Sequence, residues 1–223
     1  MTEHTDELEK RTKKIREQMG GKSRLEKMES EGKPNIRQHI DAILDEGTFQ
    51  EIGTFSRSLR EEDRETTPGD GKIGGEGEID GRPVAIAGDD ITVKRGSSSI
   101  VGSRKTSRLY ERALKMGFPY VYFGETGGGR IPDLIGAEGI SDAMPSPDIA
   151  RRRRLIPMAS VIVGQSFGGS SFHSAFSDFT VQVRGSVLAV TSPRVFEIAT
   201  GEIVSFEELG GVDVHAKTTG QIR

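Results

Sequence analysis

A run of three glycines after an apolar segment is the strongest chemical feature of the sequence. Residues 119–123 read Pro-Tyr-Val-Tyr-Phe, which is typical of a buried strand, and Gly127, Gly128 and Gly129 follow closely. Because glycine has no Cβ atom, its backbone N–H group can closely approach an anion or a developing oxyanion. One preorganised donor of this kind stabilises an oxyanion by about 3–4 kcal/mol. The alternative interpretation is an ordinary tight turn.

A second apolar segment ends in a similar glycine-rich turn. Residues 159–163 read Ala-Ser-Val-Ile-Val, and the segment from Gly164 through Ser166 to Gly168 and Gly169 follows. The Gly-x-Ser-x-Gly spacing is that of a hydrolase nucleophile elbow, so Ser166 is a candidate nucleophile. Such a serine needs a histidine and an acid in an order that the chain does not offer convincingly. The available partners are His173, His215, Asp178 and Asp213.

Other familiar motifs are incomplete. Residues 21–23 imitate the end of a P-loop, but Arg16 stands where its first glycine is required. A dinucleotide-binding fingerprint starting at Gly127 fails at Pro132, the position of its third glycine. The four histidines have no metal-ligand spacing and cysteine is absent, so we expect no metal site, disulfide or cysteine nucleophile.

Charge is more informative locally than globally. The chain has 31 basic and 34 acidic residues, a net charge of −3 that gives no case for nucleic-acid binding. Residues 94–115 nevertheless contain seven basic residues and only Glu111 as an acid. This segment either binds a polyphosphate or is a solvated face, and both interpretations remain open. For the basic run at residues 151–154 we favour a solvated face.

The expected elements position the two glycine turns at strand ends. In residues 1–48, 21 of the 48 are charged, and the apolar spacing predicts helices, so we expect a helical arm over residues 1–47. A second domain is expected over residues 48–223. It should contain a hairpin turning at Asp80-Gly81, a helix over residues 99–116, and strands over residues 119–123, 159–163 and 186–190. Strands alternating with helices predict an α/β fold.

The N-terminal residues are too charged for a secretory signal, and no apolar run approaches the roughly 20 residues that span a bilayer. We therefore expect a cytoplasmic protein without a membrane span.

Taken together, these segments resemble the N-terminal half of the carboxyltransferase (beta) subunit of biotin-dependent acyl-CoA carboxylases, of the propionyl-CoA or methylcrotonyl-CoA type. The resemblance covers about 200 residues, from IDAILDEGTFQEIG through GEGEIDGRPVAIAGDDITV, GETGGGRIPD and VIVGQSFGGSSFHSAFSDFTVQV to GEIVSFEELGG and His215. It implies a crotonase-like fold, a superhelix of ββα units.

The resemblance also implies roles for matched residues. Gly127 and Gly128 would hold the acyl-CoA thioester oxygen as it becomes an enolate, and Gly129, Gly168 and Gly169 would line the same cleft. The segment Arg95-Gly96-Ser97 would lie near the entry for CoA. Biotin, carried on a partner, would take the α-proton, so the protein amides would do the electrostatic work.

In three respects the sequence departs from the family pattern, which affects the roles assigned to these residues. Glu125-Thr126 stands where the family usually has Asp-Ser, Gly129 replaces an alanine, and Ser166-Phe167 replaces small residues. The family's full subunit would continue into a second crotonase-like half after Arg223. We therefore expect a half-subunit that is active in a hetero-oligomer with a C-terminal-half chain, a biotin carboxyl carrier and a biotin carboxylase.

Three alternatives to an acyl-CoA carboxyltransferase remain open at this point. A biotin-dependent carboxyacyl-CoA decarboxylase would use the same enolate in the reverse direction. A serine hydrolase would use Ser166. A non-enzymatic assembly subunit would use its glycine turns only for packing.

Overall fold

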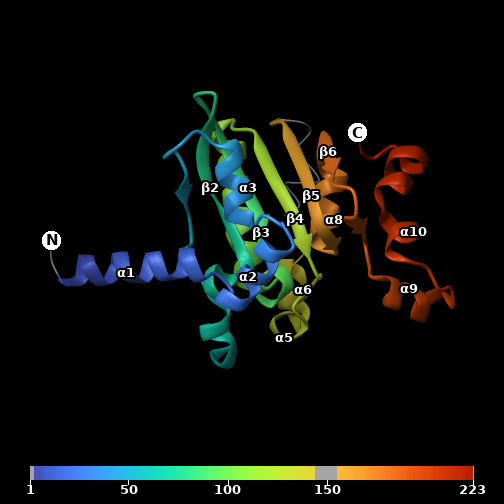
Figure 1. The fold of residues 1–223 in the computed structure, drawn as a ribbon, viewed down its shortest axis with the longest axis horizontal. Coiled ribbons are helices and arrows are strands. Elements are labelled where there is room, and N and C mark those ends of the chain that lie inside the picture. Colours follow the sequence, from blue (N-terminus) through green and yellow to red (C-terminus); the bar gives the residue numbers. More distant parts are fainter. Residues whose placement is uncertain (1–2, 144–154, 223) are drawn as a thin grey trace.

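The computed structural model describes residues 3–143 and 155–222, which form an α/β fold with three helices at the N-terminus. These helices are α1 (Glu3–Gln18), α2 (Lys22–Ser30) and α3 (Ile36–Ile43). Helix α1 extends away from the rest of the molecule (Figure 1). Helix α3 begins with a capping box, in which the Asn35 side chain accepts from the Gln38 backbone and the Gln38 side chain accepts from the Asn35 backbone.

A seven-stranded mixed sheet is the centre of the fold. Its main path runs β1-β2-β3-β4-β5-β6, and β7 pairs with β5. Strands β1 to β3 are antiparallel, whereas β3, β4, β5 and β6 are parallel. The bounds are β1 (Gln50–Glu51), β2 (Lys72–Ile79), β3 (Arg82–Asp89), β4 (Tyr120–Thr126), β5 (Met158–Phe167), β6 (Phe179–Gln182) and β7 (Val187–Ala189).

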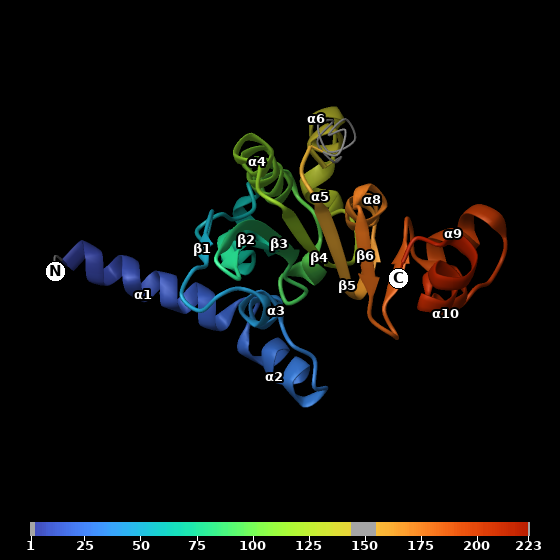
Figure 2. The same cartoon turned by 90° about the horizontal axis from the view of Figure 1, so that it is seen from above.

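Helices cover both faces of the sheet (Figure 2). Helix α3 lies on one face, and α4 (Ile100–Met116) and α8 (Gly169–Phe176) lie on the other. The short helix α6 (Ala137–Ala143) lies beside α4, and α5 (Ile131–Leu134) lies beside α6. Beyond the sheet, α9 (Pro193–Thr200), α10 (Phe206–Gly210) and the π-helical segment η4 (Val214–Thr219) complete the described chain.

Each face of the sheet has its own hydrophobic core. On the α4 face, Tyr110 and Leu109 pack against Tyr120, Tyr122 and Met158. The core on the α3 face consists of buried residues from both the N-terminal helices and the sheet: Met19, Ile36, Ile40, Leu44, Ile73, Val84, Ile86 and Phe123. The N-terminal segment therefore contributes to the core, while a domain boundary at residue 47 stays a prediction.

The expected local elements are confirmed with small shifts at their ends. The hairpin turns at Asp80 and Gly81, both with positive φ, and pairs Ile79 with Arg82. Helix α4 begins after the cap Ser99, whose hydroxyl accepts from the Gly102 N–H group, and ends at the left-handed Gly117. The sequence did not predict the short β6 and β1 as strands. None of the described helices is long and apolar enough to span a bilayer.

Candidate functional site

Three loops meet where the parallel strands β3, β4 and β5 end. Because these neighbouring strands run in the same direction, their carboxyl ends lie at one edge of the sheet. The 3₁₀ turn η3 (Lys94–Gly96) follows β3, the three-glycine turn follows β4, and Gly168 follows β5. The topology thus brings together the segment Arg95-Gly96-Ser97 and the two glycine turns that the sequence singled out.

The two glycine turns face each other across this edge. A Cβ atom placed on Gly168 would lie 3.6 Å from the Cα atom of Gly128. Gly128 has a φ of 104° and Gly168 a φ of 64°, values that side-chain-bearing residues rarely adopt. Helix α8 begins at Gly169, so its positive dipole end lies at the same place.

The backbone amides of the first turn are only partly available to a ligand. The Gly127 N–H group donates to the Arg95 carbonyl oxygen at 2.9 Å, and the Gly128 N–H group donates to Thr126 Oγ1 at 3.1 Å. Within residues 3–143 and 155–222, no acceptor is found for the N–H groups of Gly129 and Gly169. The two amides expected to hold a thioester oxygen therefore have acceptors within the protein, whereas their neighbours do not.

The η3 turn is held in a left-handed conformation. Lys94, Arg95 and Gly96 have φ values of 46°, 59° and 61° in succession. A Cβ atom on Gly96 would lie 2.5 Å from the Glu125 carbonyl oxygen, so only glycine fits there. Gly96 and Ser97 are buried, and the exposed Arg95 side chain is what this turn presents to solvent. Non-glycine residues in this region cost about 1–3 kcal/mol each and cluster at functional sites.

A buried ion pair lies beneath the first glycine turn. Arg130 Nη1 donates to Asp70 Oδ1 at 2.6 Å, and the side chains are 6% and 0% exposed. Asp70 also accepts from the Ser99 hydroxyl and, at 2.8 Å, from the Gly102 N–H group at the start of α4. Arg130 Nη2 donates to the Ser97 carbonyl at 3.2 Å. The pair thus ties the glycine turn to η3 and to α4.

A second buried ion pair connects β2, β3 and β4. Lys72 donates to Asp89 and, at 2.8 Å, to the Gly96 carbonyl. Asp89 Oδ2 accepts from the Tyr122 hydroxyl at 2.8 Å and from the Glu125 N–H group at 3.1 Å. Burial and the Asp89 charge raise the pKa of Tyr122 well above its ordinary value. Asp89 therefore fixes the end of β4 just before the glycine turn.

Glu125 lies next to these groups, and the pKa of its carboxyl group is raised. Its side chain crosses the backbone of Gly164 in β5, where a Cβ atom would overlap the carboxyl group. Burial, and then the charge of Asp89, raise the pKa of the Glu125 carboxyl to about 7, against an opposing effect of Lys33. The site therefore contains an acid that changes charge near neutral pH.

Ser166 does not have the geometry of a nucleophile. It lies within β5 with 0% exposure, has no positive φ, and its hydroxyl is bonded to Ser170. The His173 ring stacks on Tyr122 with centroids 4.4 Å apart, and His215 Nε2 contacts the Leu188 carbonyl at 2.7 Å. The serine hydrolase alternative is therefore wrong, because strand β5 continues through the position that an elbow would occupy.

The basic segment of residues 94–115 does not form one free cationic surface. Lys94 pairs with Asp63 at 2.8 Å, and Arg112 is bonded to Glu76. Lys105 is buried and donates to the Lys72 carbonyl at 2.7 Å. Most of these cations therefore have structural partners. The second basic run, at residues 151–154, lies outside the described residues.

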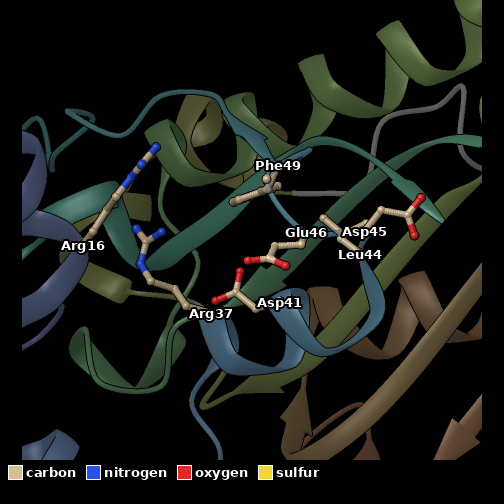
Figure 3. A pocket seen from close by; sticks show the side chains of 8 residues that line it. Arg16, Arg37, Asp41, Leu44, Asp45, Glu46 and Phe49 are labelled. Carbon is tan, nitrogen blue, oxygen red and sulfur yellow. The ribbon is translucent and has the colours of Figure 1, made fainter. Parts of the chain in front are cut away.

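A cavity of 570 Å³ lies apart from the glycine turns, between α1, α3 and the segment leading to β1 (Figure 3). Arg37 and Arg16 line it, and both also bond to Glu51. Figure 3 shows the carboxylates of Asp41 and Glu46 turned toward each other near Arg37. These opposite charges line a pocket that shares no residue with the candidate site.

Sequence reasoning found both turns and Arg95 but missed the buried groups that hold them. Asp70, Asp89 and Tyr122 were not singled out. One signal was present for Asp89, because the acidic pair Asp89-Asp90 directly follows an apolar strand, where an acid needs a partner once it is buried.

Comparisons with known proteins show the family and the fold of the chain. The carboxyl transferase domain family matches residues 27–223. The methylmalonyl-CoA carboxyltransferase 12S subunit of Propionibacterium freudenreichii subsp. shermanii is 34% identical over 206 residues, which are 91% of this chain and 39% of that protein. The propionyl-CoA carboxylase carboxyltransferase subunit of Haloferax mediterranei is 35% identical over 229 residues, covering 99% of this chain and 43% of that protein.

A solved structure of transcarboxylase 12S, with methylmalonyl-CoA and methylmalonic acid bound, superposes with a TM-score of 0.88 and 31% identity. It covers 100% of this chain and 44% of the solved one. The expected crotonase-like fold is thereby confirmed. The chain spans about two fifths of the length of these relatives. With a family match over most of its length, the chain belongs to the carboxyl transferase domain family.

Proposed function

We propose that this chain is the acyl-CoA-binding part of a carboxyltransferase in a biotin-dependent acyl-CoA carboxylase. The observation that carries the proposal is that two glycine turns, at the ends of neighbouring parallel strands, face each other with Gly168 opposite Gly128. At this spacing the two turns are in contact, and the cleft that we propose lies beside them, where N–H groups from both turns can converge on one oxygen atom.

The thioester oxygen would accept from the N–H groups of Gly129 and Gly169. Both lack an acceptor among the residues that the structure describes, whereas Gly127 and Gly128 already donate to Arg95 and Thr126. Gly127 and Gly128 then shape the turn. As the α-proton leaves, negative charge collects on the thioester oxygen, and fixed N–H dipoles stabilise this enolate more strongly than the neutral thioester. The helix dipole of α8 adds to the same field.

The remaining predicted site residues form the rim of this cleft. Arg95, Gly96 and Ser97 lie beside the first turn, and Gly168 is the second wall. Carboxyl transfer itself needs biotin, which would be carried by a partner protein and would supply the carboxyl group. We propose a C-terminal-half chain or region, a biotin carboxyl carrier and a biotin carboxylase as partners in a cytoplasmic complex. This part of the proposal is supported by relatives that are named as subunits and are more than twice as long.

The test compares two glycine substitutions. Gly168→Ala places a methyl group opposite Gly128, whereas Gly117→Ala places one at the end of α4, where nothing lies within 4 Å. Both glycines have positive φ, so both variants lose comparable backbone stability, about 1 kcal/mol. Propionyl-CoA binding, measured by calorimetry, should be lost in Gly168→Ala and kept in Gly117→Ala. Unchanged binding in a folded Gly168→Ala protein would refute the cleft.

A transfer assay then tests the reaction. The protein with its partner subunits should move the carboxyl group of methylmalonyl-CoA to biotin, and Gly168→Ala should abolish this transfer. Since carboxylation and decarboxylation use the same enolate, coupling to ATP hydrolysis distinguishes them: a carboxylase complex forms carboxybiotin with ATP, whereas a decarboxylase complex does not.

A further inference from the structure

The Arg95 guanidinium lies over the first glycine turn without a counter-charge. Its Nε atom lies 3.2 Å from where a Cβ atom on Gly127 would be, so the group covers the backbone of that turn. Its Nη2 atom donates to Gln165 Oε1 at 3.0 Å. In the described part of the chain, Arg95 takes part in no ion pair. By contrast, three cations nearby each pair with a carboxylate: Lys72, Lys94 and Arg130.

The position of Arg95 is fixed rather than incidental. Its backbone lies in the left-handed region, with a φ of 59°, and its carbonyl oxygen accepts from the Gly127 N–H group. Gln165 belongs to β5, the strand that ends at the second glycine turn. The Arg95–Gln165 hydrogen bond therefore bridges η3 and β5 across the edge of the sheet where both turns lie.

We infer that Arg95, held by Gln165, binds the carboxylate of a carboxyacyl thioester. A guanidinium group has five donors in a planar fork that matches a carboxylate in a bidentate manner. Gln165 accepts one N–H and is neutral, so the charge and the remaining donors stay available to a ligand. The inference rests on the proposed function, because it assumes that the glycine turns hold a thioester.

A carboxylate fits this position better than a CoA phosphate does. Arg95 covers Gly127, two residues from Gly129, whose N–H group we propose for the thioester oxygen. In a malonyl-type thioester, a single carbon atom separates the carboxylate from the thioester carbonyl. The whole pantetheine arm separates the phosphates of CoA from that carbonyl. A cation beside the thioester site is therefore within reach of the carboxylate and not of the phosphates.

The experiment measures binding of methylmalonyl-CoA and propionyl-CoA, which differ by the carboxylate, to the full protein. Arg95→Gln should weaken methylmalonyl-CoA binding about tenfold or more, the usual effect of losing a charged hydrogen bond. Propionyl-CoA binding should weaken at least about threefold less than methylmalonyl-CoA binding, because propionyl-CoA has no carboxylate for the guanidinium group. Gln165→Glu supplies an internal carboxylate for Arg95 and should produce the same selective loss without removing the cation. Arg82→Gln, at the β2–β3 hairpin on the opposite edge of the sheet, makes the same charge change as a control.

Each outcome decides one question. A selective loss in both Arg95→Gln and Gln165→Glu supports the carboxylate site. An equal loss for both thioesters would mean that Arg95 contacts the CoA portion, and unchanged binding would mean that it contacts neither; both results overturn the inference and leave the proposed function intact. If the wild-type protein binds neither thioester, the proposed function fails first. Thermal melting of each variant confirms that the variant is folded.

Discussion

Breaking the buried pair between Asp70 and Arg130 should destabilise the protein strongly. In Asp70→Ala, the guanidinium group of Arg130 stays buried, with two Ser97 oxygens as hydrogen-bond partners at 3.2 and 3.3 Å and the Asp133 carboxylate 3.7 Å away. Breaking a buried pair costs about 3–5 kcal/mol, and the remaining charge of Asp133 places the expected loss at the lower end of this range. The same change removes one of the two acceptors of the Gly102 N–H group at the start of α4, while the Ser99 hydroxyl stays as the cap.

Arg130→Met should also destabilise the protein, because two buried carboxylates, Asp70 and Asp133, then lose their cation. The Asp70 carboxylate keeps two donors, the Ser99 hydroxyl and the Gly102 N–H group, which partly compensate its charge. The double variant removes both charges. Its loss of stability should therefore fall short of the sum of the single losses by about 2 kcal/mol, within the usual range of coupling between contacting residues.

Urea unfolding followed by far-UV circular dichroism measures these free energies, provided that the slope with urea stays constant across the four proteins. Leu8→Ala, at a half-exposed position on α1, provides a control for a change outside the network. Losses that add within about 0.5 kcal/mol would refute the claim that the two side chains form a buried pair.

Three further predictions concern titratable groups, each checked by unfolding at several pH values. Burial lowers the pKa of His173 to about 4, so between pH 6.5 and 4 the unfolded chain binds a proton that the folded chain does not. The unfolding free energy should therefore decrease as pH is lowered from 6.5 to 4, and it should decrease less in His173→Phe. The pKa of Glu125 is raised to about 7, so this group should lower stability as pH rises from 4.5 to 7, and Glu125→Gln should be more stable than wild type at pH 8. Burial lowers the pKa of Lys105 to about 8, so the cost of burying its charge is relieved as pH rises from 8 to 10.5. At pH 7, Lys105→Met should still lose about 1–3 kcal/mol, because the carbonyls of Gly53, Gly69 and Lys72 each lose one donor; Gly53 keeps the Ser56 N–H group and Gly69 keeps the Lys72 N–H group.

Local structure was predictable wherever one residue type dictates the backbone. Asp80-Gly81 fixed the hairpin, and Gly117 ended α4, because these positions need positive φ. The short strand β6 gave no such signal. Its four residues pair with β5 only because the rest of the parallel sheet is already in place.

The places of the two glycine turns at strand ends were predictable, but the hydrogen bonds of their N–H groups were not. Strand–glycine segments indicated where bare backbone would lie, and this required no knowledge of tertiary contacts. Arg95 and Thr126 supply the acceptors for the N–H groups of Gly127 and Gly128. These two residues therefore determine which N–H groups of the turn stay available to a ligand. Those acceptors come from a distant turn and from a side-chain rotamer, and neither has a periodicity or a motif in the sequence.

The same reasoning explains why local sequence charge misrepresents the cleft. Residues 94–115 carry a large positive excess, yet Lys94 is neutralised by Asp63 and Lys105 is buried among carbonyls. The buried pairs of Lys72 and Arg130 likewise present no net charge to a ligand. Among the described residues, the field at the glycine turns thus depends mainly on the dipole of α8, the Glu125 carboxyl and the guanidinium of Arg95. The pKa of Glu125 is about 7, so its carboxyl group is ionised above this pH and then repels an anionic ligand, whereas the neutral form does not. Binding of a carboxyacyl thioester should therefore weaken above about pH 7, and Glu125→Gln should remove this pH dependence.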